Sequence, residues 1–455
     1  MFSYQQEFPK DLKGIVDAIE DYKGSEERSK LLMYKSYFNG ENDFIEKFKR
    51  MIWSDKQKRV IENVIAPNYK TRYNFFADMV SQKVNTLFAE TPSIKDMDSN
   101  ESKQIGYCLN NAGKEASIEG YSFTYVGLDS LKPFETENCI AYTDDMSGEI
   151  KAFIRFWVRN INGKEITFFE LYEEDGFTTY KVDKGIAAVF KEKQGYKVKI
   201  DTSKLSSIST NIKLSKIPIV LFKNNKEMTS DLKLNIKCKI DMIDFIQSGL
   251  INNIDEFSDV WITINVPSAT MEQVQEIKEN IRRSKATVFA GTDEKNSVGF
   301  ETLQIPYEAR AKAIELLKGE LIEDAGVIDF KDIKGAATNV QIEARLLKLK
   351  QRVSDFEWFA DEAATEIVKL WQEYHNEDFD IDITFNKLYI KNNQEIINQA
   401  LSLHNYISEY SFLNMLKSVG VIDDIEEEIK RLQKEGVNKF QITDNEGDDY
   451  GQGTF

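Results

Sequence analysis

The stretch DFKDIKGAATNVQIEARLLKLKQRVSDFEW, Asp329–Trp358, decides how the chain folds in our interpretation. A loop rich in charged and small residues runs into a helix whose apolar positions recur at steps of four and three. These positions are Ile342, Leu346, Leu349, Val353, Phe356, Ala360, Ala363, Ile367, Leu370 and Tyr374. Thr338 and Gln341 form a T-x-x-Q capping box at its start. A helix from Thr338 to His375 would span roughly 57 Å, about three times the usual length.

The residues just ahead of this helix could in principle hold a phosphate on the helix N-terminus. Gly335, Ala336 and Ala337 stand where a phosphate-binding loop would lie. A Walker loop requires G-x-x-x-x-G-K-[ST] after a strand, and neither that lysine nor a preceding strand is apparent. The charged residues of the loop, which nearly balance, are Asp329, Lys331, Asp332 and Lys334. We therefore predict a surface loop before a capped helix rather than a nucleotide site.

The composition is that of a large folded protein. The 455 residues include 41% hydrophobic and 12% aromatic residues and only seven prolines, which excludes disorder for most of the length and allows two or more domains. No run approaches the roughly 20 apolar residues of a membrane span. The N-terminus has neither an apolar signal core nor a cleavage site, which predicts synthesis into a cytoplasm.

Charge, histidine and cysteine restrict the function classes. The formal net charge is −17, and no dense basic tract offers a tight clamp for nucleic acid. The only histidines are His375 and His404, so the commonest acid–base catalyst is absent from most of the chain. The odd, widely spaced cysteines Cys108, Cys139 and Cys238 argue against a disulfide framework and form no CxxC pair. These features favour a non-catalytic protein without a cofactor.

The periodicity changes along the chain. Residues 1 to about 105 read as helical, with a break at Asn39-Gly40. From about 106 to 225 the period is two, with hairpin turns at Asn162-Gly163 and Asp175-Gly176. We therefore predict helices followed by an antiparallel β region.

A second group of elements follows. A helix is predicted from about residue 230 to 258, then a small α/β insert over 259–305, then a helix over 306–325 opened by Pro306. After the long helix come a strand at DFDIDITFNKLYI and further helices between Asn393 and Glu435, broken at Gly420. The tail 441–455 is predicted to be disordered. The expected fold class is α+β, mainly helical.

One row of carboxylates is a candidate metal site. Asp378, Asp380 and Asp382 alternate on the predicted strand, so they would share one face. Such a row could bind Mg²⁺ or Mn²⁺ and serve a nuclease or hydrolase. The alternative is an ordinary solvent face, with Phe379 and Ile381 directed inward, which is the commoner outcome for an acidic row.

The order of these parts resembles the portal, or head-to-tail connector, proteins of tailed bacteriophages, in particular those of phages of Gram-positive hosts. The resemblance covers most of the chain and rests on order and spacing rather than on one diagnostic motif. The segments that carry it are YKSYFNGENDFI, NYKTRYNFFADMVSQKVNTLF, KIPIVLFKNNKEMTSDLKLNIKCKIDMIDFIQSGLINNIDEF and GAATNVQIEARLLKLKQR.

The resemblance implies a portal architecture and its function. The implied parts are a wing (1–229, with the long helix and following strand, 338–392), two stem helices (230–258 and 306–325), a clip (259–305), a tunnel loop (326–337), a crown (393–440) and an acidic tail (441–455). It implies a ring, usually of twelve subunits, at one capsid vertex, through which double-stranded DNA is packaged and ejected without sequence preference. The protein would be in the virion, and in the host cytoplasm during assembly.

The resemblance also assigns partners and residues. The partners would be the terminase large subunit, which supplies the ATPase, a head-tail connector or adaptor protein, and the major capsid and scaffolding proteins. The tunnel loop, Asp329 to Ala337, would face DNA. The clip residues expected to meet partners are Glu272, Glu276, Arg282, Arg283, Asp293 and Lys295. The competing hypotheses are the carboxylate-metal enzyme and a different assembly factor with a coiled-coil long helix.

Overall fold

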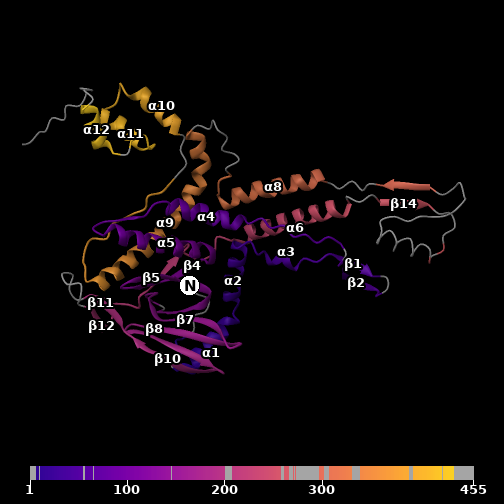
Figure 1. Ribbon diagram of the computed structural model, residues 1–455, viewed down its shortest axis with the longest axis horizontal. Coiled ribbons are helices and arrows are strands. Elements are labelled where there is room, and N and C mark those ends of the chain that lie inside the picture. The colour runs from indigo at the N-terminus through magenta and orange to yellow at the C-terminus, as the bar shows by residue number, and fades with distance from the viewer. Residues whose placement is uncertain are drawn as a thin grey trace, which may run out of the picture. The chain divides into compact units, whose positions relative to one another are not determined.

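The computed structural model describes residues 7–9, 11–54, 57–64, 66–144, 146–199, 208–257, 261–265, 270, 272, 297–301, 307–329, 339–388, 393–422 and 424–434. Its elements confirm a mixed α+β fold (Figure 1). The chain forms two compact units, one of Met1–Val327 with Lys348–Leu388 and one of Ile328–Leu347 with Tyr389–Phe455. Among the described helices, none is long and apolar enough to cross a membrane.

The N-terminal region is helical but not throughout. Its helices are α1 (Leu12–Lys23), α2 (Glu26–Phe38), α3 (Asp43–Lys47) and α4 (Phe75–Leu87). The predicted break is confirmed, since α2 ends at Phe38 and Gly40 has a φ of 76°. A hairpin of β1 (Met51–Ser54) and β2 (Arg59–Glu62) interrupts the region, so the prediction of helix alone over residues 1–105 was wrong there.

The boundary predicted at residue 106 was also wrong, because helix α5 (Ser99–Glu119) continues to residue 119. Small residues replace large apolar ones on its packed face, which hides the helical period. A Cβ atom added at Gly113 would lie 3.1 Å from a ring atom of Phe88, 3.2 Å from Phe356 and 3.3 Å from Phe222. Close contact with these rings therefore adds to the burial of Ile105 and Leu109 in holding α5 in place.

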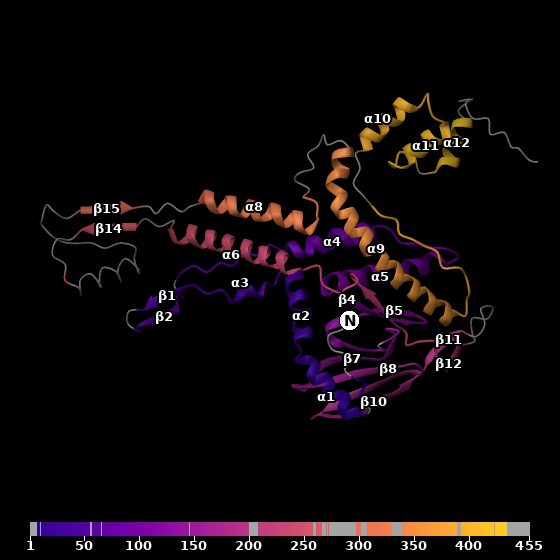
Figure 2. The same cartoon turned by 180° about the vertical axis from the view of Figure 1, so that it is seen from behind.

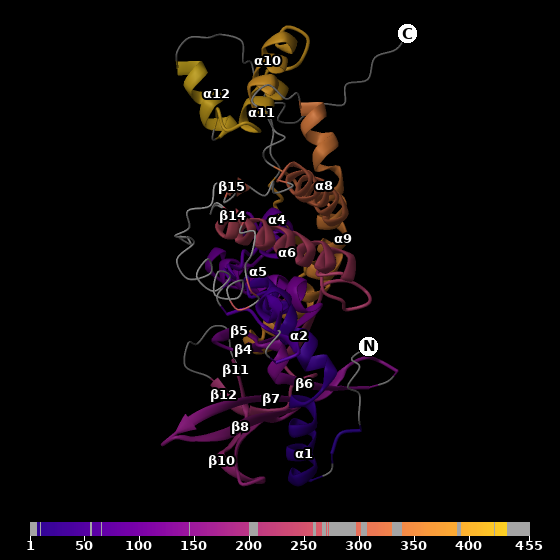
Figure 3. The same cartoon turned by 90° about the vertical axis from the view of Figure 1, so that its right-hand side faces the viewer.

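A five-stranded antiparallel sheet follows in the order β10-β9-β8-β7-β6 (Figure 3). Its strands are β6 (Cys139–Thr143), β7 (Ile150–Ile161), β8 (Lys164–Glu173), β9 (Gly176–Asp183) and β10 (Ile186–Gln194). The two predicted hairpins form, but the second turns at Glu174-Asp175, one residue before the predicted position, because Gly176 already pairs with Glu173. Asn162 and Gly163 have φ of 54° and 77°, as a two-residue type I′ turn requires.

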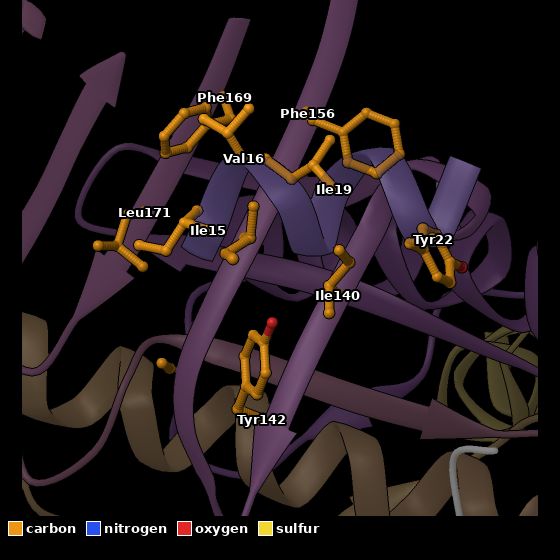
Figure 4. Packing of buried hydrophobic residues seen from close by; sticks show 11 residues of the cluster. Ile15, Val16, Ile19, Tyr22, Ile140, Tyr142, Phe156, Phe169 and Leu171 are labelled. Carbon is orange, nitrogen blue, oxygen red and sulfur yellow. The ribbon is translucent and has the colours of Figure 1, made fainter. Parts of the chain in front are cut away.

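Helix α1 covers one face of this sheet (Figure 4). Side chains from the helix interlock with alternate residues of the strands, because one face of a strand presents every second residue. The buried members shown are Ile15, Val16, Ile19, Tyr22, Ile140, Tyr142, Phe156, Phe169 and Leu171. The other face of the sheet is only partly covered, by a three-stranded sheet in the order β13-β4-β5.

The remaining strands connect these layers. The three-stranded sheet consists of β4 (Tyr121–Gly127), β5 (Ser130–Phe134) and β13 (Ile219–Lys223), and a 3₁₀ turn spans Thr136–Asn138. Aromatic side chains fill the space between the two sheets, and Phe123 and Phe153 have ring centroids 4.9 Å apart. Two short pairs complete the set: β11 (Tyr196–Lys199) with β12 (Ile208–Ile212), and β3 (Ser93–Ile94) with β16 (Ile383–Thr384).

Two long helices run side by side in the middle of the sequence (Figures 1 and 2). They are α6 (Leu234–Phe257) and α8 (Tyr307–Ala325), and their bounds agree with the helices predicted at 230–258 and 306–325. Between them in sequence, β14 (Trp261–Asn265) pairs antiparallel with β15 (Ser297–Glu301). The rest of the α/β insert predicted over 259–305 lies outside the described residues, Thr270 and Glu272 apart.

Helix α9 (Asn339–His375) is the long helix that the opening stretch predicts. Its ten predicted apolar positions are all buried, with no more than 4% of any of these residues exposed. In the second unit, α10 (Asn393–Leu403), α11 (Glu409–Lys417) and α12 (Ile425–Lys434) follow. Gly420, with a φ of 74°, lies at the predicted break, and Leu413, Ile422 and Ile425 form the small core there.

Candidate functional site

The candidate site is the α6–α8 hairpin and the polar contacts that fix it to the rest of the first unit. The two helices are antiparallel, because the start of α6 pairs with the end of α8. Lys239 Nζ lies 2.9 Å from Asp324 Oδ2 and 3.1 Å from Glu320 Oε2. With the amide of Asn253 turned to satisfy its neighbours, its oxygen accepts from both Nη atoms of Arg310, at 2.9 and 3.0 Å.

The buried face of α6 changes character along the helix. The sequence predicts an inward stripe at steps of three and four: Leu232, Ile236, Ile240, Ile243, Gln247, Leu250 and Ile254. Ile236, Ile240 and Ile243 are buried as this stripe requires. Further along, the stripe prediction was wrong, since Ile254 is 47% exposed. The buried residues there are Asp244, Ser248 and Asn252, each 1% exposed. A polar face therefore replaces the apolar one in the second half of the helix.

This polar face binds the main chain of the segment Tyr69–Tyr73. Asp244 Oδ1 accepts from the Tyr73 N–H at 2.7 Å, and Ser248 Oγ accepts from the Thr71 N–H at 3.0 Å. Asn252 accepts from the Tyr69 N–H at 2.6 Å and donates to the Tyr69 carbonyl at 3.0 Å. We call these three side chains and their partners the backbone clamp.

The backbone clamp has a simple geometric basis. Four helical residues rise about 6.0 Å, and two residues of extended chain rise about 6.6 Å. Side chains four apart on α6 therefore meet every second amide of an antiparallel extended segment. Because these amides are partly buried against the helix, each benefits from a hydrogen-bond partner, and the acceptors of α6 supply it.

Asp241 extends the polar contacts toward α2 and α3. Its Oδ1 accepts from the Tyr37 hydroxyl at 2.6 Å and from Asn42 Nδ2 at 3.0 Å, and Asn42 also donates to Asp244 Oδ2 at 2.8 Å. Burial raises the pKa of Asp244 to about 6, against the hydrogen bonds from Asn42 and Tyr73, which lower it. Burial thus disfavours the ionised form of Asp244 relative to the protonated form.

A second polar cluster joins the start of α6 to α4 and α9. Lys83 Nζ lies 2.6 Å from Asp231 Oδ2, and Arg352 Nη2 lies 3.1 Å from the same oxygen. Asn224 accepts from Lys83 at 2.6 Å and donates to Asp231 Oδ1 at 3.0 Å. The Lys83 ammonium also lies 4.2 Å from the centroid of the Phe356 ring. We call this the junction.

The two cations decide the protonation of the junction. Burial would raise the pKa of Asp231, yet Lys83 and Arg352 hold it at about 2. Burial lowers the pKa of Lys83 to about 8, although Asp231 opposes that change. At neutral pH one carboxylate therefore faces two cations, so it neutralises one of the two positive charges between α4, α9 and the start of α6.

Most residues predicted for DNA or partner contact lie outside the described part of the chain. Asp329, half-buried, and Glu272, exposed, are described. The others are Lys331, Asp332, Lys334, Gly335, Ala336 and Ala337 of the loop and Glu276, Arg282, Arg283, Asp293 and Lys295 of the insert. Of the two residues of the predicted capping box, Gln341 is exposed in the first turn of α9. Thr338 lies outside the described residues.

The acidic row is not a strand. Residues 377–382 have no regular structure, and only Ile383–Thr384 pair with β3. Asp378, Asp380 and Asp382 are all exposed, while Phe379 and Ile381 are half-buried, which agrees with the solvent-face interpretation. Among the described residues, no group of three or more His, Cys, Asp or Glu side chains is arranged to hold a metal ion. The strand prediction failed because alternation alone cannot supply a pairing partner.

The histidines have structural contacts. His375 is buried, its Nδ1 lies 2.9 Å from the Trp371 carbonyl oxygen, and its ring stacks on Trp371 at 4.0 Å. Burial lowers its pKa, so the neutral ring is favoured. His404 Nε2 lies 3.3 Å from Glu409 Oε2.

The sequence patterns do not predict the clamp or the junction, although each has a signal in the sequence. Lys83 falls among the apolar positions of α4, where an unpaired charge would be costly. Asp244, Ser248 and Asn252 recur at steps of four on one line of α6. A polar residue at a position that the helical period assigns to the interior indicates a buried partner.

These elements define the fold: a mixed α+β protein with one long helix and with a helical hairpin held by polar contacts. A family model described as phage portal protein, SPP1 Gp6-like, matches residues 17–439. The chain therefore belongs to this family of phage portal proteins. It is 25% identical over 464 residues to the portal protein of Bacillus phage SPP1, covering 92% of this chain and 87% of that protein. These matches give no support to the nuclease hypothesis.

Proposed function

We propose that this portal protein assembles into a ring at one vertex of the capsid and forms the channel for packaging and ejection of double-stranded DNA. The single observation that carries the proposal is the α6–α8 hairpin, in a chain that belongs to the portal family. Several large apolar side chains of the hairpin are exposed in one subunit, and neighbouring subunits of a ring would cover them. They are Leu234, Met242, Phe245, Ile251, Ile254, Tyr307 and Leu316.

The assignment of parts follows from that proposal. Helices α6 and α8 would form the stem, the insert 259–305 the clip, residues 326–337 the tunnel loop, and α10 to α12 the crown. Residues 1–229 with α9 and the segment after it would form the wing. The order of elements and the agreement of α6, α8 and α9 with their predicted bounds support this division.

The clip and the capsid-facing parts would meet different proteins. We assign the clip, with Glu272 exposed, to terminase during packaging and to a head-tail connector afterwards, and the rest of the ring to the capsid and scaffolding proteins. The portal itself would need no catalytic residue or cofactor, because terminase would supply the ATP-driven step. The net charge of −17 suits a channel through which DNA slides, since strong neutralisation of phosphates would hold it.

Negative-stain microscopy with mass measurement by light scattering tests the ring. We expect rings of about a dozen subunits with a central hole. Leu316→Glu, on the exposed surface of α8, should block assembly without unfolding the subunit. Ala309→Glu adds the same charge at another exposed position of α8 and serves as the control. A wild-type chain that stays monomeric across salt and protein concentrations would contradict the proposal.

The tunnel loop has its own test. Replacing Lys331 and Lys334 by alanine should change the amount of DNA packaged or retained, while rings still form. Packaging that is unchanged in this variant would contradict the assignment of the loop to the channel and leave the ring proposal intact.

A further inference from the structure

A second feature, apart from the hairpin, has the chemistry of a binding site. A cleft of about 500 Å³ lies on the five-stranded sheet and has Arg155, Trp157, Phe168, Glu170, Thr179 and Lys191 in its wall. The strand register places Arg155, Glu170, Thr179 and Lys191 in one row across four strands, and Trp157 beside Phe168 in the next. Lys132, Glu135, Arg159 and Phe190 complete the lining.

The cleft opens on the face of the sheet that α1 does not cover. Successive residues of a strand point to opposite faces. On β7, Ile154 and Phe156 belong to the core beneath α1, so Arg155, Trp157 and Arg159 belong to the other face. The three-stranded sheet covers this face around Phe153, which lies in the core between the two sheets. Phe134 of its strand β5 reaches the cleft, with its ring centroid 4.7 Å from the Arg155 guanidinium.

The charges of the cleft are not balanced. Arg155 is committed to Glu170, with Nη1 3.3 Å from Oε2, and the Tyr172 hydroxyl also donates to that oxygen at 3.0 Å. Within the described part of the chain, Lys132, Arg159 and Lys191 form no ion pair, and all three are exposed. Glu135 is the one other carboxylate of the lining. The cleft is therefore locally cationic in a chain of net charge −17.

Three aromatic side chains, Trp157, Phe168 and Phe190, line the same cleft. The rings of Trp157 and Phe168 are stacked with centroids 5.9 Å apart, and the Phe190 ring meets Phe168 edge-on at 5.2 Å. The Arg159 guanidinium lies 5.8 Å from the Trp157 centroid and 5.6 Å from that of Phe168. Phe190 is nevertheless 52% exposed. An apolar surface is thus available beside unpaired positive charge.

We propose that this cleft binds an acidic peptide segment of another protein that carries an aromatic side chain. The aromatic group would cover Phe190, and flanking carboxylates would reach Lys132, Arg159 and Lys191, which come from three different strands. Glu135 and Glu170 within the lining disfavour a run of phosphates, whereas a peptide can place neutral groups beside them. Charge complementarity makes peptide binding dependent on ionic strength. This inference does not depend on the proposed ring.

Fluorescence anisotropy of a labelled peptide, DDEFEDD, tests the proposal on the full chain. We expect saturable binding that weakens as the ionic strength rises to about 0.5 M. The uncharged peptide NNQFQNN should bind far more weakly. Arg159→Glu should lower the affinity by about tenfold or more, and Lys103→Glu, the reversal of an exposed charge on α5, should leave it unchanged.

A second variant separates the aromatic contribution. Phe190→Ala should weaken DDEFEDD but not DDEAEDD, which lacks the ring. Circular dichroism of each variant establishes that it is folded. Equal losses in the Arg159 and Lys103 variants would overturn the proposal, since net charge alone would then explain binding. Displacement of DDEFEDD by a short DNA duplex that binds more tightly would also overturn it and assign the cleft to nucleic acid.

Discussion

Lys83 Nζ and Asp231 Oδ2 lie 2.6 Å apart and join helix α4 to the segment that leads into α6. Arg352 of α9 shares the same carboxylate oxygen. The start of the hairpin is therefore tied to two helices of the surrounding core by one acidic group. Removing that group would leave the buried Lys83 and the half-buried Arg352 without their shared anion.

Asp231→Asn should destabilise the protein by about 3 kcal/mol, because it breaks a largely buried ion pair. The side chain of Asp231 is 15% exposed to solvent. The expected loss of stability is therefore at the low end of the range for buried ion pairs. Urea unfolding measures the change. Lys83→Met should cost less, since Asp231 keeps Arg352. Equal costs for the two substitutions would contradict the central position of Asp231.

The same carboxylate predicts a loss of stability in acid. Its pKa is about 2 in the folded chain against an ordinary value of 3.8. A lowered pKa contributes stability above pH 3.8, and this is lost as the pH falls through 3.8 toward 2. The difference corresponds to about 2 kcal/mol. Unfolding at a series of pH values should show this loss in the wild type and not in Asp231→Asn.

Asp244 predicts the opposite trend in a different window. Its pKa is raised from 3.8 to about 6. The stability that Asp244 contributes to the folded chain is therefore fully present below pH 3.8 and is lost as the pH rises through 6. The stability of the wild type relative to Asp244→Asn should therefore fall between pH 4 and pH 6.5. A difference that stays constant over this range would show that Asp244 does not titrate there.

The backbone clamp can be tested at Asn252. Asn252→Ala removes the acceptor and the donor that satisfy the Tyr69 main chain, at a cost of about 2 kcal/mol. Amide hydrogen exchange at Tyr69 should become faster. Asp255→Ala, at an exposed position three residues further along α6, is the matched control and should change neither property appreciably.

The α1 contact with the sheet should contribute strongly to stability. Ile19 is 1% exposed and lies in the cluster that α1 forms with the sheet. Ile19→Ala should cost about 3 kcal/mol through lost burial and the cavity left behind. Asp17→Ala, at an exposed position of the same helix, should be nearly neutral. A small effect at Ile19 would indicate that the sheet does not depend on α1.

The sequence predicted those helices and turns whose periodicity or turn residues lie within one continuous stretch of the chain. Helix α9 is the clearest case, because a helix buried along one continuous stripe shows that stripe in its own residues. The turn at Asn162-Gly163 was equally visible, since only a few residues accept positive φ at both positions. Helix α5 was partly missed because Gly113 faces three rings that come from distant segments.

The polar contacts were beyond sequence patterns for a related reason. Asp244 and Asn252 are buried because the main chain of Tyr69–Tyr73 lies against them. Nearly every residue type has the same main-chain N–H, so the sequence of that segment does not show which amides bind a side chain. The pairing of Lys83 with Asp231 likewise requires knowing that α4 and the start of α6 meet. The tunnel-loop and clip residues remain predictions.

The backbone clamp also implies an uneven tolerance to change during evolution. Every residue type except proline offers the main-chain N–H that α6 binds, so the side chains at 69, 71 and 73 can drift as long as the chain stays extended. The positions of Asp244, Ser248 and Asn252 have no such freedom. Related portals should therefore preserve polar residues at four-residue steps on this helix. The amino-acid sequence of the segment that corresponds to residues 69–73 should vary more.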